Sequence, residues 1–182
     1  MHGRIGKHPE QPIANSAVSD ASRGRICHVE PLDDIDRAIL LELQRDGRLT
    51  NQELADRVGL SPSPCLRRVR QLQERGVITR YTAVVSQAAV GLPITALVRL
   101  SLVSHAGDII EQVEARIRSI PEIVEAHLLA GDDDYLIKVV VGSLEEFEAF
   151  MRRDLRTMPA LASIRTTFAY GVTKAPAPLP LR

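Results

Sequence analysis

Residues 50–75 read TNQELADRVGLSPSPCLRRVRQLQER and predict two short helices joined by a tight turn. Thr50 and Glu53 form a T-x-x-E capping box, which satisfies backbone donors at the start of the first helix. Gly59 follows where the chain must turn, because glycine adopts a positive φ without a Cβ clash. The Ser-Pro pair at 61–62 suits the N-cap and first position of the second helix. The stretch therefore predicts a helix-turn-helix that reads duplex DNA.

The second helix of this motif is expected to present a basic outer face. Its apolar residues recur at helical spacing and should face inward: Cys65, Leu66, Val69 and Leu72. Residues 61–75 hold four arginines against one acid, although the whole chain balances 23 basic with 23 acidic residues. Arginine contacts guanine bidentately, and a helix fits the major groove. The alternative is a surface helix whose arginines are merely solvated.

The expected DNA contacts divide into readers of bases and holders of phosphate. The predicted DNA-binding residues are Ser61, Ser63, Arg67, Arg68, Arg70, Gln71 and Arg75. Ser63, Arg67, Arg68 and Gln71 are expected to approach base edges. The DNA phosphates are expected to be contacted by Arg70, Arg75 and either Arg48 or Arg57.

The composition limits the other classes of function. At 182 residues the chain suits one ordinary domain or two small ones, with a normal 45% of hydrophobic residues. No apolar run approaches the roughly 18 to 20 residues of a membrane span, and no signal-peptide core is visible, so we expect a cytoplasmic protein. Cys27 and Cys65 form no C-x-x-C motif and the histidines are not clustered, which argues against a zinc site and a disulfide framework.

The chain divides into five segments. We expect a flexible N-terminal arm over 1–30, in which Arg4, Lys7, Arg23 and Arg25 either add phosphate contacts or are passive. A DNA-binding domain over 31–80 begins with a helix capped by Asp33. VITRYTAVVS at 77–86 reads as an extended wing or exit strand, continuing into a strand or linker over 81–91. The last two segments are a second domain over 92–173 and an extended Pro-rich tail over 174–182.

The second domain has the pattern β-α-β-β-α-β. Alternation from Ile94 to Leu102 predicts a strand, and a helical stripe over 107–120 follows it. Two more strands, 122–130 and 134–141, flank a short GDD turn. A second capping box, Ser143 with Glu146, opens a helix before the final strand. Leu144, Phe147, Met151 and Leu155 are expected to face inward on that helix, which Pro159 ends.

This arrangement is ferredoxin-like, so the fold class is α+β with an N-terminal winged helix-turn-helix domain. Helices would cover one face of the sheet only. Leu97 and Val103 lie opposite the inward set on the first strand, so the other face also carries apolar residues. We therefore predict a homodimer in which two sheets face each other, whose paired reading heads match a pseudo-palindromic DNA site.

Four strings carry a family resemblance: LDDIDRAILLELQRDGR, GLSPSPCLRRVRQL, GVITRYTAVV and AGDDDYLIKV. On these the chain closely resembles the Lrp/AsnC family, the feast/famine regulators, over roughly 32–173. The resemblance implies a transcription factor of amino-acid metabolism that assembles from dimers into octamers or larger discs. It also implies a small effector, an amino acid or a related molecule, bound in the C-terminal domain between dimers.

The turn that matches the family's effector site is Gly131-Asp132-Asp133-Asp134-Tyr135. The predicted effector-binding residues are Leu129, Ala130, Gly131, Asp132, Asp133 and Asp134. Asp132 or Asp133 suits the ammonium of a free amino acid, while backbone donors near Gly131 suit its carboxylate. The alternative is an ordinary hairpin turn. Asp133 stands where many relatives carry an aromatic or apolar residue, which puts the choice of effector in doubt.

No catalytic residue, metal or cofactor is required by this reading. The competing interpretation is an enzyme similar to the siroheme decarboxylases, which resemble members of the same two-domain family. Such a site would require paired histidines in the C-terminal half. Only His105 and His127 are available there. A third reading is an architectural protein that compacts DNA without responding to an effector.

Overall fold

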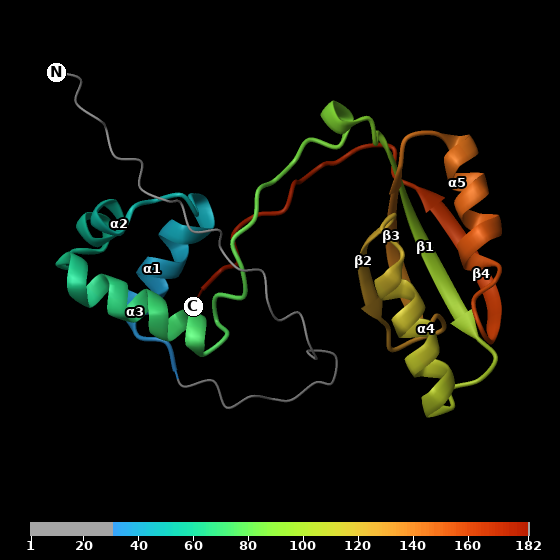
Figure 1. Ribbon diagram of the computed structural model, residues 1–182, viewed down its shortest axis with the longest axis horizontal. Helices are drawn as coiled ribbons and strands as arrows, with labels where there is room; N and C mark the ends of the chain where they lie inside the picture. The colour runs from blue at the N-terminus through green and yellow to red at the C-terminus, as the bar shows by residue number, and fades with distance from the viewer. Residues whose placement is uncertain (1–30, 182) are drawn as a thin grey trace, which may run out of the picture.

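The computed structural model describes residues 31–181, so the expected N-terminal arm over 1–30 and Cys27 lie outside the described part. Two folded units stand apart in Figure 1 and are joined by two extended segments. One unit is a cluster of three helices, and the other is a sheet with helices packed against it. The helix cluster is called the head below, and the sheet unit is called the ligand domain.

The head consists of α1 (Asp34–Arg45), α2 (Asn51–Val58) and α3 (Pro62–Glu74). Asp33 caps α1 as predicted, because its carboxylate accepts a hydrogen bond from the Asp36 N–H at 2.8 Å. The capping box of α2 is formed in both directions between Thr50 and Glu53. Gly59 ends α2 with a φ of 69°, the left-handed conformation that the turn requires.

The three helices share one apolar core. The buried residues of this core are Ile39, Leu40, Leu54, Ala55, Cys65 and Leu72. The prediction that Leu66 faces inward is wrong, because this side chain is 38% exposed. Cys65, Val69 and Leu72 already form the inner stripe, and Leu66 lies about 100° of helical rotation from Cys65, toward the outside.

The segment after α3 is extended but forms no regular strand. Residues 77–86, expected as a wing or exit strand, have no ladder partner within 31–181. A strand is defined by hydrogen bonds to a neighbour, and the β-branched composition supplies only the extended backbone. A short 3₁₀ helix, η1 (Ala88–Val90), precedes the sheet.

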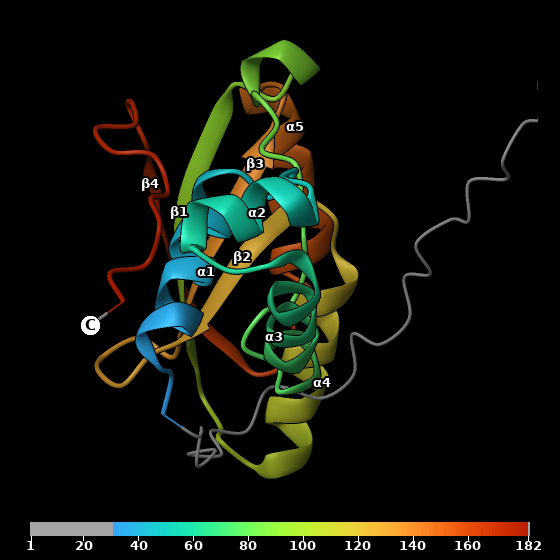
Figure 2. The ribbon, with the colours of Figure 1, turned by 90° about the vertical axis from the view of Figure 1, so that its left-hand side faces the viewer.

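The ligand domain confirms the predicted β-α-β-β-α-β order. Its strands are β1 (Ile94–Leu102), β2 (Ile123–Leu128), β3 (Tyr135–Val141) and β4 (Leu161–Phe168). They form one sheet in the order β2-β3-β1-β4, with every neighbouring pair antiparallel. Figures 1 and 2 show α4 (Gly107–Ser119) and α5 (Leu144–Phe150) on the same side of this sheet. Alternate residues of β1 from Ala96 to Leu102 point into the resulting core.

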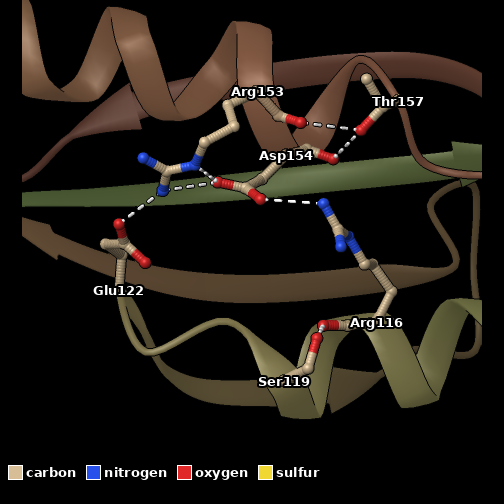
Figure 3. A network of polar contacts seen from close by, with 6 residues as sticks. All are labelled: Arg116, Ser119, Glu122, Arg153, Asp154 and Thr157. Carbon is tan, nitrogen blue, oxygen red and sulfur yellow. Dashed lines mark hydrogen bonds and ion pairs between the residues drawn. The ribbon is translucent and has the colours of Figure 1, made fainter.

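A π-helical turn, η2 (Met151–Leu155), continues α5 and buries Asp154. Figure 3 shows that this carboxylate accepts hydrogen bonds from Arg116 of α4 at 2.9 Å and from Arg153 at 2.7 Å. Arg153 also bonds to Glu122 ahead of β2 at 2.7 Å. A buried carboxylate must be paired to be tolerated, and here the pairing joins both helices of the layer.

The start of α5 departs from the predicted inward stripe. Leu144 was expected inside, but it is 58% exposed, whereas Phe147 and Phe150 are buried. Leu144 occupies the first helical position, directly after the Ser143 cap, and lies outside the core cluster. The reverse bond of the capping box also differs, because Glu146 accepts from the N–H of Gly142 and not from that of Ser143.

The helix-free face of the sheet is less apolar than the alternation suggested. Leu97 on this face is 37% exposed, and Val103 just beyond β1 is 72% exposed. In the strand register, however, Arg99 lies opposite Arg165, and Leu97 lies opposite Lys138. This face therefore combines apolar and cationic side chains. No helix between residues 31 and 181 is long and apolar enough to cross a bilayer.

Candidate DNA-binding surface and effector turn

The outer side of α3 forms a shallow groove. Its lining residues are Ser63, Leu66, Arg67, Arg70, Gln71 and Glu74. Four of the predicted DNA contacts thus lie together on one exposed surface. Leu66, assigned to the core from the sequence, adds an apolar contact at the groove, and Glu74 adds an acid. Ser61 stands at the N-cap of α3 and Pro62 at its first position, although the Ser61 hydroxyl makes no capping bond.

Arg67 and Arg70 are the accessible cations of this groove. Both residues are exposed, and neither guanidinium takes part in an ion pair or hydrogen bond within the described residues. An arginine with its five donors uncommitted can bind a phosphate or a guanine edge without first breaking an internal contact.

Arg68 has a different environment. Its Nη1 donates to Asp33 Oδ2 at 2.6 Å and to Asp36 Oδ1 at 2.9 Å, and its side chain is only 25% exposed. The backbone N–H of Asp36 and the Arg68 guanidinium together lower the pKa of Asp33 below its ordinary value. Arg68 therefore ties α3 to the N-terminus of α1. Predicted from the helical pattern as an outward base contact, it instead points to a partner 35 residues away in sequence.

Two of the arginines expected to contact phosphate also lie close to acidic side chains of the head. Arg75 Nη1 lies 3.9 Å from Asp36 Oδ2, and Arg57 donates to Glu42 of α1 at 3.0 Å. Arg48 is exposed, like Ser61 at the start of α3. The sequence held a signal for these pairings in the acids of α1, Asp36 in its first turn and Glu42 near its end, but their partners become visible only once the helices pack.

The turn between β2 and β3 lies at one end of the sheet. The N–H of Leu129 donates to the carbonyl of Asp134 at 2.8 Å, which closes the hairpin. Gly131 is exposed, and a Cβ added to it would meet no atom within 4 Å. The backbone at Gly131 is therefore open on the side where a Cβ would stand.

Asp133 is engaged by neighbouring strands. It accepts hydrogen bonds from Arg165 of β4 at 2.5 Å and from Ser101 of β1 at 3.1 Å, and Arg99 Nε lies 3.9 Å away. The hydrogen bond from Arg165 is the main cause of its lowered pKa. This carboxylate is therefore held ionised by cations of the protein itself.

Asp134 is engaged on the other side of the turn. It accepts the N–H of Leu102 at 2.7 Å, and its other oxygen lies 2.7 Å from His105 Nε2. The bond from Leu102 is the largest cause of its lowered pKa. Asp132, by contrast, is exposed and has no hydrogen-bond partner among residues 31–181. Of the three acids, Asp132 is the one whose oxygens are available.

The two histidines of the ligand domain do not form a pair. His105 contacts Asp134, while His127 Nε2 lies 2.7 Å from Glu125 on β2. No group of three His, Cys, Asp or Glu side chains converges to a metal-binding arrangement in the part of the chain that the structure describes.

Comparisons with known proteins agree with both units. A family model described as winged helix-turn-helix DNA-binding matches residues 32–79, and one described as Lrp/AsnC ligand binding domain matches residues 95–179. The leucine-responsive regulatory proteins of Salmonella typhimurium and Escherichia coli are 42% identical over 135 residues, which is 74% of this chain and 82% of theirs.

Solved structures show the same architecture. A transcriptional regulator from Neisseria meningitidis, solved as a complex with L-Met, matches with a TM-score of 0.77 at 37% identity. An AsnC family regulator from Agrobacterium tumefaciens matches with the same TM-score at 34% identity. Each match covers 82% of this chain and 97% of the other.

Proposed function

Because this chain belongs to the Lrp/AsnC family of DNA-binding transcriptional regulators, we propose that it binds operators through α3 in response to an amino acid at residues 129–134. The observation that carries the DNA part is the exposed outer groove of α3, where Arg67 and Arg70 remain uncommitted. The observation that carries the effector part is the accessible backbone at Gly131 beside the available carboxylate of Asp132.

We assign different roles to the polar and cationic side chains of the head. Ser63, Arg67 and Gln71 read base edges from the groove, and Arg70 holds a phosphate at its rim. Arg68 acts as a positioning residue, because its bonds to Asp33 and Asp36 fix the angle between α3 and α1. The remaining contacts to the DNA phosphate backbone come from Ser61, Arg75 and either Arg48 or Arg57.

The effector turn supports a free amino acid as ligand. Asp132 accepts the ammonium, and backbone N–H groups near Gly131 donate to the carboxylate. Leu129 and Ala130 provide the adjoining wall, while Asp133 and Asp134 shape the turn through their bonds to β1 and β4. The regulator from Neisseria meningitidis was solved with L-Met, which supports an α-amino acid as the ligand class.

The assembly that we propose is a homodimer formed through the helix-free sheet face, with dimers joined into an octamer or a larger ring. Partly exposed Leu97 on that face supports this contact, and the flanking Arg99 and Lys138 require acidic or polar partners across it. Two heads on one dimer match a pseudo-palindromic operator.

The test is a thermal-shift screen of the twenty amino acids, followed by DNA binding to the gene's own upstream region with and without each hit. A stabilising amino acid that changes operator affinity supports the proposal. Equal affinity for upstream and random DNA, together with no response to any amino acid, would favour the architectural reading. A Soret shift on adding siroheme would instead favour the enzymatic one, which the separate pairing of His105 and His127 does not support.

A further inference from the structure

The C-terminal end of the chain returns to the head. After β4 the chain runs extended away from the ligand domain and ends beside the helix cluster (Figure 1). There the N–H of Leu179 donates to Gln44 Oε1 at 2.6 Å, and Gln44 Nε2 donates to the Leu179 carbonyl at 3.5 Å. One side chain of α1 thus holds both polar groups of one tail residue, 135 positions away in sequence.

The contact is also apolar. Leu181 is half-buried and packs against the core cluster of the head. It helps to line a groove of about 760 Å³ whose walls come from α1 and from the extended segment after α3. The apolar wall residues include Leu32, Leu40, Leu43, Val77, Tyr81 and Val84.

The sequence of this tail suits docking as an extended ligand. Residues 175–181 read APAPLPL, with proline at every second position. Proline fixes φ and favours an extended polyproline conformation, so little conformational entropy remains to be lost on docking. Pro-rich segments commonly bind grooves of this kind that include an aromatic side chain, here Tyr81.

We propose that residues 175–181 form a C-terminal clasp, an intramolecular ligand that holds the head to the ligand domain by a second connection. The first connection is the segment that leaves α3 and enters β1. One extended segment leaves the head free to rotate, whereas a second attachment at Gln44 of α1 restricts its orientation. The tail that forms part of the groove wall belongs to the same chain, because it follows β4 directly and reaches Gln44 within its own length.

The clasp also connects the effector turn to the head, an extension that rests on the proposed function. Arg165 of β4 bonds to Asp133 of the turn, and β4 continues into the tail. A ligand that displaces the turn therefore acts on the strand that leads into the tail, whose Leu179 contacts α1. Head orientation then responds within one subunit, in addition to any change in how dimers pack.

Hydrogen exchange of the full-length protein tests the docking without DNA or effector. Since Pro176, Pro178 and Pro180 have no N–H, a C-terminal peptide reports on few amides, among them that of Leu179. We expect this peptide to exchange more slowly than the same peptide free in solution, and Gln44→Ala to accelerate it about two- to tenfold. Gln44→Glu keeps an oxygen acceptor and retains the protection.

Gln52→Ala on α2 is the matched control, because Gln52 is also exposed and bonds only to Asp56 nearby. It leaves exchange of the tail unchanged. A wild-type tail that exchanges like the free peptide overturns the proposal. So does protection that persists in Gln44→Ala.

Cross-linking decides which copy supplies the tail. Gln44→Cys and Leu179→Cys are combined in a chain carrying Cys27→Ser and joined by a short bismaleimide in a mixture of ¹⁴N and ¹⁵N protein. Linked peptides of a single isotope support the clasp within one subunit. Mixed-isotope peptides would show a tail exchanged with a second copy and would overturn it.

The effect on regulation is read from a chain ending at Lys174. We compare operator affinity with and without the amino acid. In this variant we expect the ratio of the two affinities to move toward one, while the amino acid still binds. An unchanged ratio overturns the connection through β4. If neither chain binds DNA, the proposed function fails, and the exchange measurement still decides the clasp.

Discussion

The outer face of α3 and the turn at 131–134 are both charged surfaces predicted from short stretches of sequence, yet the structure treats their charges in opposite ways. On α3, Arg67 and Arg70 remain exposed and uncommitted within the described residues. In the turn, Asp133 and Asp134 are bonded to β1, β4 and His105, and only Asp132 is available. A charge found by sequence pattern is therefore available to a binding partner only if packing has not already paired it.

The largest effect that the comparison predicts is on operator affinity. Arg67→Ala should weaken binding to a cognate site by about 1 to 3 kcal/mol, or about 5- to 150-fold, if this uncommitted guanidinium reads a base. Random DNA should lose much less. Fluorescence anisotropy at fixed salt measures both, with exposed Arg156→Ala in the ligand domain as control. Equal losses on both DNAs would assign Arg67 to phosphate contact.

The next effect is on the effector. Asp132→Asn should weaken binding of the amino acid by about 1 to 2 kcal/mol, because it removes the only uncommitted carboxylate from the turn. Asp133→Asn should weaken it less, since Arg165 already occupies that carboxylate. Isothermal titration with the amino acid found in the thermal screen compares the two. The reverse order would show that the ligand displaces Arg165.

A smaller effect separates two neighbouring arginines of α3. Arg68→Ala should lower the free energy of unfolding by at most about 1 kcal/mol, because its ion pairs with Asp33 and Asp36 are partly exposed. Arg70→Ala should leave stability unchanged and reduce the slope of log affinity against log salt by about 1. Urea unfolding and salt titration of both variants check this. A stability loss confined to Arg70→Ala would contradict the assignment.

The smallest effect is the dependence of stability on pH. The folded-state pKa values of Asp133 and Asp134 are lowered, so their contribution is fully present above about 3.9, the ordinary value for aspartate. This stabilisation is lost as the pH falls below about 3.9 and passes through the lowered pKa values of the two carboxyl groups. Thermal unfolding between about pH 5 and pH 3 should show a smaller decrease for the double variant Asp133→Asn/Asp134→Asn than for the wild type.

Local sequence rules predicted the elements well wherever neighbours in sequence decide the outcome. The Asp33 cap, the Thr50 and Glu53 capping box and the left-handed Gly59 all form as expected. Each of these contacts spans three residues or concerns one backbone conformation, so the residue types alone specify it. The β-α-β-β-α-β order followed in the same way from alternating and helical periodicity.

The predictions that failed concern positions at the margin of a pattern. Leu66 and Leu144 fit an apolar stripe by spacing but lie outside the two cores. Phe150 and Asp154 are buried in addition to the predicted Phe147 and Leu155, and Asp154 lies in the π-helical turn, which departs from 3.6 residues per turn. Periodicity counts residues per turn, and it cannot register a local change in that number.

The sequence by itself determined the two folded units, the turn glycine, the basic composition of α3 and the position of the acidic turn, because all of these depend on residue type and spacing along the chain. Tertiary structure decided which charges are available. Arg68 is paired with α1, Asp133 with β4, and Gln44 with the end of the chain, across 32 to 135 residues of sequence. Such pairings arise only when packing brings distant segments within hydrogen-bond distance, where a complementary donor, acceptor or opposite charge replaces water.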